Sequence, residues 1–299
     1  SWLFSGASVV GQSHLTTSTP CQDKFQLQTS KDGNWLAMAI CDGAGSAEFA
    51  ELGASITSQH FCQELIKLSH ELDSRTPGEW INDFVIDCVI QVRNQLRSAA
   101  KSDDIRKYHC TLVAALVGKS GGFSIHIGDG AVIGGTFGQA SASKPTELNS
   151  DYFISKPENG EYANETYFIT EGSWVKHLRI TPLPRLDWIV ACTDGGASLL
   201  LDNELQVKPN FLAPFIETQV NKRFTDQLYI ESVLNDPKAN KLTTDDKTIV
   251  LAVRSSSITL PASFQFSIEE KSPAQLVQAA PPAVVTASAH SMQAKSSPQ

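Results

Sequence analysis

Short apolar runs that end in aspartate and glycine recur along this chain of 299 residues. The clearest are Trp35–Ile40, Ser124–Ile127 and Trp188–Thr193, each followed closely by an Asp-Gly pair. Short apolar runs bounded by small residues are typical of buried strands. Each run therefore carries a carboxylate to the point where a strand reaches the surface. The glycine beside it lets the backbone approach a ligand closely.

Two long segments instead show helical periodicity. Apolar residues recur every three or four positions over Ser46–Leu72 and again over Thr76–Leu96. We expect Ser46 to N-cap the first helix, and Thr76-Pro77-Gly78-Glu79 fits the capping box that opens a second. Two later helices are expected at Phe211–Val220 and Phe224–Leu234.

The remaining strands occur in groups. They are expected at Gly6–Gly11, Phe25–Gln28, Cys110–Val117, Gly122–Ile127, Ala131–Phe137, Thr248–Val253 and, as an edge strand, Ile258–Ser267. The polar stretch His14–Asp23 is expected to be a turn. Grouped strands separated by paired helices favour antiparallel sheets with helices packed outside them, in an α+β domain. A doubly wound parallel sheet would alternate strand and helix, which this order does not.

Two segments differ from the rest in composition. Residues 138–187 are polar and proline-containing, and we interpret them as a surface insertion, or flap, with short strands such as Thr166–Thr170. Residues 269–299 are rich in Ala, Pro, Ser and Gln and contain no aromatic residue. Such a segment buries too little apolar surface to offset the entropy of ordering, so it is predicted to be a disordered tail after a domain at 1–268.

Charge and cysteine content limit the possible partners. The formal charge of −8 argues against general binding to nucleic acid or acidic membranes, although bound metal ions can reverse the local sign for a phosphorylated substrate. The six cysteines form no CxxC pair, as expected for reduced thiols in a cytoplasmic protein. We see neither a secretory signal nor an apolar run long enough to span a membrane.

The aspartates indicate the chemistry. Asp42, Asp129 and Asp194 follow apolar strands, and Asp245-Asp246 precedes another, which suggests one shared cation site. Carboxylate and carbonyl oxygens suit Mg²⁺ and Mn²⁺. Two such ions about 3.5–4 Å apart can activate water and clamp a phosphate. Of the pair Asp245-Asp246, one aspartate is expected to be a ligand and the other a neighbour or cap.

The ordered motifs resemble the protein phosphatase 2C type of metal-dependent protein phosphatases, in a bacterial-like branch. The motifs are Gln22-Asp23, Asp42-Gly43-Ala44-Gly45-Ser46, Gly128-Asp129-Gly130, Thr193-Asp194-Gly195 and Asp245-Asp246-Lys247-Thr248. The resemblance covers roughly residues 5 to 255. It implies a four-layer α-β-β-α sandwich of two antiparallel sheets flanked by helices, with two or three Mn²⁺ or Mg²⁺ ions between the sheets.

The resemblance also implies roles for single residues. Asp42 would bridge two metals, and the Gly43 carbonyl would bind the second. Asp194 and Asp245 would complete the first site, and Asp129 would help to hold a third ion. Gln22 would contact the second metal or lie just outside its ligands. Asp23 and Asp246 are expected to lie behind the metal ligands without binding a metal themselves.

Three positions depart from the family pattern. Gln22 replaces a usual acidic residue, Ser18 replaces a usual phosphate-gripping arginine, and Ala44 replaces a common histidine. Protonation of the leaving group would then fall to metal-bound water or to His14.

The resulting functional expectation is a monomeric serine/threonine protein phosphatase. It would hydrolyse phosphoserine and phosphothreonine in proteins by attack of a metal-bridging hydroxide, with Asp42, Asp194 and His14 as catalytic residues. The alternative from another class is a weakly active pseudo-phosphatase that binds phosphoproteins as a scaffold. A narrower alternative is a phosphatase of small phosphate esters.

Overall fold

The described part of the chain is built around two antiparallel sheets. The computed structural model describes residues 1–138, 147–157, 166–222 and 227–257. The first sheet has the order β1-β10-β9-β6-β7, and the second has the order β2-β3-β4-β5-β8. The strands are β1 (Trp2–Val9), β2 (Lys24–Thr29), β3 (Leu36–Cys41), β4 (Leu112–Val117), β5 (Gly122–Ile127), β6 (Ala131–Gly135), β7 (Phe153–Ser155), β8 (Arg179–Leu183), β9 (Trp188–Cys192) and β10 (Lys247–Arg254).

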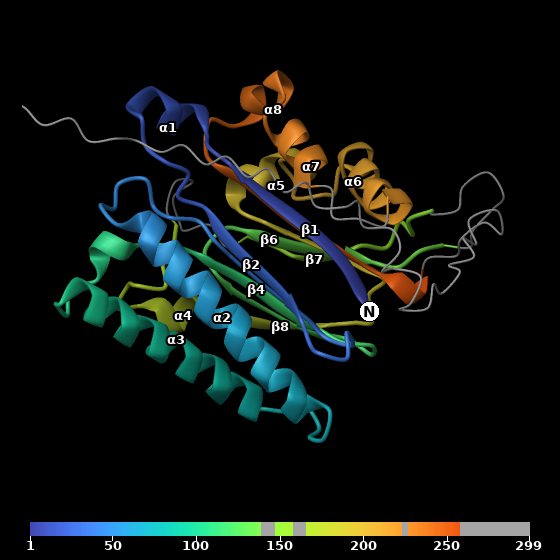
Figure 1. Ribbon diagram of the computed structural model, residues 1–299, viewed down its shortest axis with the longest axis horizontal. Helices are drawn as coiled ribbons and strands as arrows, with labels where there is room; N and C mark the ends of the chain where they lie inside the picture. Colours follow the sequence, from blue (N-terminus) through green and yellow to red (C-terminus); the bar gives the residue numbers. More distant parts are fainter. Residues whose placement is uncertain (139–146, 158–165, 223–226, 258–299) are drawn as a thin grey trace, which may run out of the picture. The chain divides into compact units, whose positions relative to one another are not determined.

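Helices cover the outer faces of both sheets (Figure 1). The second sheet is covered by α2 (Ala50–Leu72) and α3 (Trp80–Ala100). The first is covered by α5 (Asp194–Leu200), α6 (Pro209–Lys222), α7 (Gln227–Leu234) and α8 (Pro237–Leu242). Shorter helices are α1 (Gln12–Thr17) and α4 (Trp174–His177), with 3-10 turns at Arg106–Tyr108 and Ser255–Ser257. The expected α+β fold with the layer order α-β-β-α is confirmed.

Strand β3 illustrates why the layers form. All six of its residues are buried. Ala37, Ala39 and Cys41 contact the layer under α2 and α3, whereas Leu36, Met38 and Ile40 belong to the core between the sheets. Successive side chains of a strand point to opposite faces, so an entirely apolar strand must be covered on both sides. Small residues on the helix face allow the helices to pack close to the sheet.

Four local expectations were wrong. The predicted turn at 14–23 begins with helix α1, which is too short to show apolar periodicity. Helix α2 starts at Ala50, so Ser46 is not its N-cap, and α3 starts at Trp80 without a side-chain cap, so no capping box forms. Residues 166–170 are not a strand. At the start of α2 the Phe49 N–H donates to the distant Lys107 carbonyl oxygen, so a tertiary contact takes part in setting where that helix begins.

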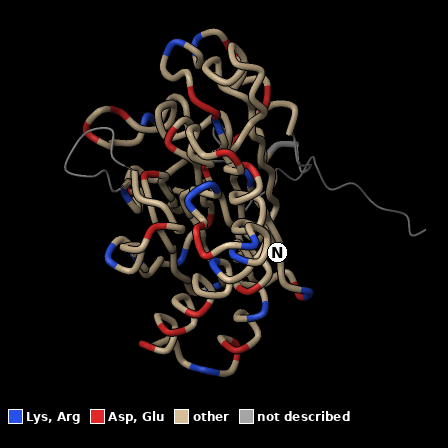
Figure 2. The backbone as a smooth tube through the Cα atoms, turned by 90° about the vertical axis from the view of Figure 1, so that its left-hand side faces the viewer, with Lys and Arg blue, Asp and Glu red and all other residues tan. Residues whose placement is uncertain are grey.

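Other expectations are confirmed or lie outside the described residues. The helix expected at Phe224–Leu234 is α7, described from Gln227. The proposed strand at Ile258–Ser267, the boundary at 268/269 and the tail lie outside the described residues. All six cysteines are free thiols. Acidic and basic positions are interspersed along the described chain (Figure 2). Among the described helices none is both long and apolar enough to cross a membrane.

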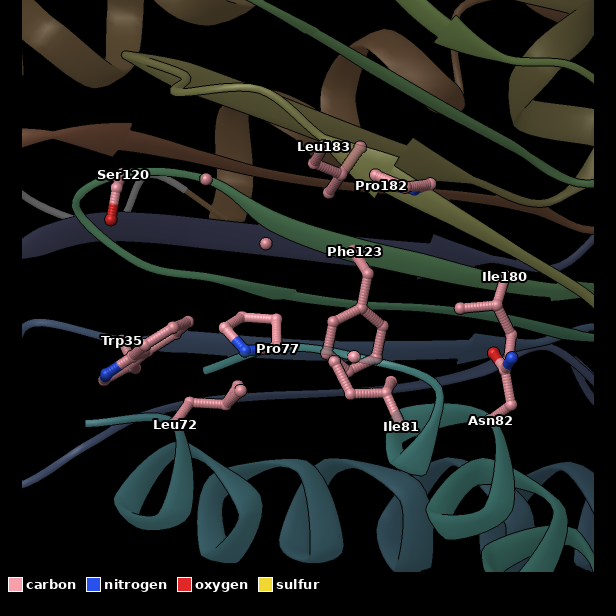
Figure 3. Close-up of a pocket in the computed structure, with 13 residues that line it drawn as sticks. Trp35, Leu72, Pro77, Ile81, Asn82, Ser120, Phe123, Ile180, Pro182 and Leu183 are labelled. Atoms are coloured by element: carbon pink, nitrogen blue, oxygen red, sulfur yellow. The ribbon is translucent and has the colours of Figure 1, made fainter. Parts of the chain in front are cut away.

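The second sheet carries different cavities at its two ends. At the end where β5 begins, an apolar pocket of about 520 Å³ opens between α3, β8 and the β4–β5 turn. The rings of Trp35, Pro77 and Phe123 line it, with Ile81 and Ile180 (Figure 3). The Trp35 indole N–H donates to Asp73 at 2.8 Å. At the other end, where β3 and β5 finish, the lining is acidic.

Candidate metal centre

The strand-end aspartates line one cleft of about 250 Å³. Asp42 follows β3, Asp129 lies in the turn between β5 and β6, Asp194 opens α5, and Asp245 precedes β10. The β5–β6 turn crosses from one sheet to the other, and in the first sheet Ala131 and Ile249 both pair with Cys192. This register brings the ends of strands from both sheets to the same edge of the sandwich.

Glycine is required where these segments meet. A Cβ atom on Gly195 would lie 2.0 Å from the carbonyl oxygen of Asp246, so only glycine allows α5 to start against that backbone. Gly128 has φ +109°, which favours glycine and turns the chain towards Asp129. Two of the Asp-Gly motifs therefore reflect backbone packing as well as turn formation.

Burial and mutual repulsion affect the protonation of the carboxylates. Burial, followed by the charges of Asp23 and Asp194, raises the pKa of Asp42 well above its usual range. Burial and the charge of Asp129 raise the pKa of Asp194 to about 6, and burial also raises the pKa of Asp129. No Lys or Arg is among the described residues that line this cleft. Bound divalent cations would supply the missing positive charge.

Asp23 lies beneath the cleft and is 1% exposed. Its Oδ2 accepts hydrogen bonds from the Thr193 and Thr248 hydroxyls at 2.8 and 2.7 Å, while Oδ1 has no partner among the described residues. Burial raises the pKa of Asp23 to about 7 despite these hydrogen bonds. A buried carboxylate oxygen without a partner is costly, so its placement near Asp42 fits a centre that holds cations.

Asp246 organises the loops around the cleft. Its Oδ1 accepts from the Gly11 N–H at 2.7 Å, and its Oδ2 accepts from the Gln22 N–H at 2.6 Å. Oδ2 also lies 2.9 Å from His14 Nδ1. Asp246 is 4% exposed, whereas the neighbouring Asp245 is exposed and has no hydrogen bond to its carboxylate within the described residues. The geometry supports Asp245 as the ligand of the pair and Asp246 as its neighbour.

Gln22 is placed differently from the aspartates. Its side chain is not among the residues lining the cleft, and its buried Oε1 has no hydrogen-bond partner. A metal-bound water is one group that could satisfy this oxygen. Direct ligation by Gln22 stays a prediction, whereas its backbone N–H has a defined role in holding Asp246.

Sequence reasoning missed several threonines. The Thr166 hydroxyl donates to Asp129 Oδ2 at 2.7 Å, and the Asp42 N–H donates to the Thr111 hydroxyl at 3.0 Å. Thr193 and Thr248 hold Asp23. Of these four threonines, only Thr193 and Thr248 lie in motifs noted from the sequence, Thr-Asp-Gly and Asp-Asp-Lys-Thr. Even these two did not stand out, because threonine next to aspartate is common in ordinary turns.

The arrangement suits hard divalent cations. In the described part of the chain, no three His, Cys, Asp or Glu side chains already stand together as a ligand set for one ion. Mg²⁺ and Mn²⁺ keep several waters and accept backbone carbonyls, so they need fewer protein carboxylates per ion. Carboxylates from Asp42, Asp194, Asp245 and Asp129, with the Gly43 carbonyl, provide an oxygen-only set in one cleft.

Comparisons with known proteins agree with this reading. The family described as Protein phosphatase 2C matches residues 10–229. Serine/threonine-protein phosphatase 3 of Escherichia coli (strain K12) is 30% identical over an alignment of 269 residues, and the match covers 85% of this chain and 98% of that protein.

Solved structures share the fold. A serine/threonine phosphatase of S. agalactiae superposes with a TM-score of 0.56 at 13% identity, covering 85% of this chain and all of that one. A bacterial serine phosphatase gives a TM-score of 0.54 at 14% identity, covering 84% of this chain and 96% of that one. The motif order, the paired sheets and the sequence match to the family lead to one conclusion: the chain belongs to the protein phosphatase 2C family.

Proposed function

We propose that this chain is a metal-dependent phosphatase of phosphoserine and phosphothreonine in proteins. The observation that carries the proposal is the cleft in which Asp42, Asp129, Asp194 and Asp245 meet, with no Lys or Arg among the described residues that line it. The 30% identical relative is named a serine/threonine-protein phosphatase, which supports the same substrate class.

Two Mn²⁺ or Mg²⁺ ions would be held by Asp42, the Gly43 carbonyl, Asp194 and Asp245. Asp129, fixed by Thr166, would help to hold a third. When bound, such ions activate water and neutralise charge on the phosphate. The chain's own residues supply the fixed carboxylates, because Asp23, Thr193 and Thr248 form a hydrogen-bonded support below them.

His14 would donate a proton to the leaving serine or threonine oxygen. Asp246 accepts from its Nδ1 at 2.9 Å, which orients the opposite edge of the ring, Nε2, towards Gly45 in the cleft lining. Ser18, which stands where the family pattern leads us to expect a phosphate-gripping arginine, ends α1 in the left-handed conformation at φ 56°. Phosphate binding here would therefore rely on the metal centre more than on an arginine of this segment.

The test is turnover of a phosphopeptide with Mn²⁺ by the wild type and by Asp42→Ala. We expect a loss of at least about 10²–10³-fold, as seen when a preorganised electrostatic group is removed from an active site. Asp103→Ala is a matched control, because the Asp103 side chain is fully exposed. Near-normal turnover by the Asp42 variant would rule out the proposed centre.

Calorimetric titration with Mn²⁺ distinguishes the proposed phosphatase from its main rival, a phosphoprotein-binding domain with little activity. Two or more sites that weaken in Asp42→Ala support a phosphatase. A single weak site or none would favour the rival. Comparison of kcat/KM for phosphopeptides and small phosphate esters then tests the substrate class.

A further inference from the structure

A second groove continues from the metal cleft. It has a volume of about 420 Å³ and shares Asp129 and Asp194 with the cleft. Its other lining residues come mainly from α5, from the turn after it and from the end of α8: Pro157, Ala197, Ser198, Leu201, Asp202, Asn203, Leu205, Lys208 and Leu242. We call it the Lys208 groove. A substrate whose phosphate lay in the cleft could extend directly into it.

Lys208 places one ammonium group in this groove beside the carboxylates of Asp129, Asp194 and Asp202, whereas the described lining of the cleft contains no Lys or Arg. Its Nζ donates to the Ser198 carbonyl oxygen at 2.9 Å, which fixes the half-buried side chain against α5. An ammonium group has three N–H donors, so others remain for a ligand. Within the described residues, Lys208 has no carboxylate partner.

The nearby carboxylate of Asp202 is already engaged. Its Oδ1 accepts from the N–H groups of Glu204 and Gln206, both at 2.9 Å, and so closes the turn that connects Leu201 to Val207. Asp202 therefore acts as a turn residue, and in the described part of the chain it forms no ion pair with Lys208.

The same turn holds Leu205 in an unusual conformation. Its φ of 57° lies in the left-handed region, which a leucine seldom adopts and glycine or asparagine would adopt more easily. Leu205 lines the groove, as does Leu242, whose side chain is 49% exposed. The groove thus combines an apolar wall and one fixed ammonium group with the carboxylates that it shares with the cleft.

We propose that the Lys208 groove binds the substrate chain beside the phosphorylated residue. An apolar side chain would pack on Leu205 and Leu242, and an acidic side chain would pair with Lys208. This inference rests on the proposed function and adds to it a preference for phosphorylated segments that contain apolar and acidic residues. Continuity with the cleft and the charge of Lys208 both favour a peptide as the occupant.

The experiment uses two short fluorescent peptides that differ in charge. Both carry a non-hydrolysable phosphonate in place of phosphoserine and leucines on both sides of it, one with flanking glutamates and the other with flanking lysines. Affinities are measured by anisotropy with Mn²⁺ for the wild type, Lys208→Met and Lys208→Glu. Lys119→Met, on the exposed β4–β5 turn at the other end of β5, is the matched control.

We expect the wild type to prefer the glutamate peptide and Lys208→Met to lose about threefold to fivefold of that affinity, as for a partly exposed ion pair. Lys208→Glu should prefer the lysine peptide, and Lys119→Met should behave as the wild type. Leu205→Asn, which tolerates the same backbone conformation, should weaken both peptides about equally.

Turnover of p-nitrophenyl phosphate with Mn²⁺ is measured in parallel, because this small ester does not reach the groove. The Lys208 variants should retain it. If the wild type hydrolyses the ester but Lys208→Met and Lys208→Glu bind both peptides as the wild type does, the groove proposal is overturned and the phosphatase proposal survives. If the wild type hydrolyses neither the ester nor phosphopeptides but the charge preference follows Lys208, the phosphatase proposal is overturned and the groove proposal survives.

Discussion

The two ends of strands β3 and β5 carry opposite chemistry. β3 begins beside Trp35 in the apolar pocket and ends beside Asp42 in the acidic cleft, and β5 runs from Phe123 to the turn that contains Asp129. At the apolar end the one polar side-chain atom of Trp35 has a partner in Asp73. At the acidic end Asp23 keeps a buried oxygen without one.

The apolar end of these strands therefore contributes mainly to stability, whereas the acidic end contributes mainly to the proposed function. Apolar contacts at the Trp35 end stabilise the fold without further partners. Burial of the carboxylates at the Asp42 end, together with their mutual repulsion, raises their pKa values and lowers the stability of the metal-free protein. A cluster that destabilises the isolated chain is the expected property of a site that holds cations.

The sharpest test of this comparison is Asp194→Asn. We expect phosphopeptide turnover with Mn²⁺ to fall by about 10³-fold, because a ligand carboxylate is lost. The Tm of the metal-free variant should rise, because a buried charge and its repulsion with Asp129 and Asp245 are removed. Asp73→Asn at the other end is the control and should retain turnover. A metal-free Tm below that of the wild type would contradict the proposed repulsion.

Phe123→Ala should lower the stability of the fold and leave activity nearly unchanged. Phe123 is 5% exposed and packs in the core under α2 and α3, so its truncation should destabilise the fold by about 3 kcal/mol. Urea unfolding measures this loss, and kcat/KM at low temperature should remain within about twofold of the wild type. A large fall in kcat/KM of the folded variant would show that the two ends are coupled.

Asp246→Ala should have an intermediate effect. It removes the acceptor for the Gly11 and Gln22 N–H groups and for His14, so we expect Mn²⁺ affinity or activity to fall about 10- to 100-fold. Calorimetry and steady-state kinetics measure both quantities. His14→Gln, which leaves the two backbone contacts intact, should lower kcat more than Mn²⁺ affinity. Equal losses of Mn²⁺ affinity in the two variants would argue against the scaffold role of Asp246.

The pH dependence of the metal-free protein gives a smaller effect. The folded pKa values of Asp23 and Asp194 are raised to about 7 and about 6, so these groups favour folding below their unfolded values near 4. That contribution is lost as pH rises from about 4 through about 7. We therefore expect the Tm in EDTA to be several degrees higher at pH 5 than at pH 8. Mn²⁺ should raise the Tm more at pH 8 than at pH 5. A higher Tm in EDTA at pH 8 than at pH 5 would refute the assignment of this effect to Asp23 and Asp194.

The smallest expected effect is that of Asp73→Ala. It removes the acceptor of the Trp35 indole N–H at a partly exposed position, so the free energy of unfolding should fall by about 1 kcal/mol or less. Urea unfolding at pH 7 provides the measurement. A loss above about 2 kcal/mol would mean that the rim of the apolar pocket contributes more than its single hydrogen bond.

Much of the fold could be predicted because strand signals are local. Leu112–Val117, Gly122–Ile127 and Trp188–Cys192 are apolar runs closed by small residues, and each is a strand. Helix α1 and the start of α2 were not predicted correctly, because distant segments contact their first turns. Ala44 and Phe49, for example, donate backbone hydrogen bonds to His109 and Lys107.

The sequence by itself determined that carboxylates stand at four strand ends, since alternation and turn chemistry act over a few residues. The tertiary structure alone decided what each carboxylate does. Asp245 and Asp246 are neighbours of identical chemistry, yet pairing of β1 with β10 brings Gly11 to Asp246 and leaves Asp245 exposed in the cleft. A hydrogen bond between residues more than two hundred positions apart leaves no trace in local sequence.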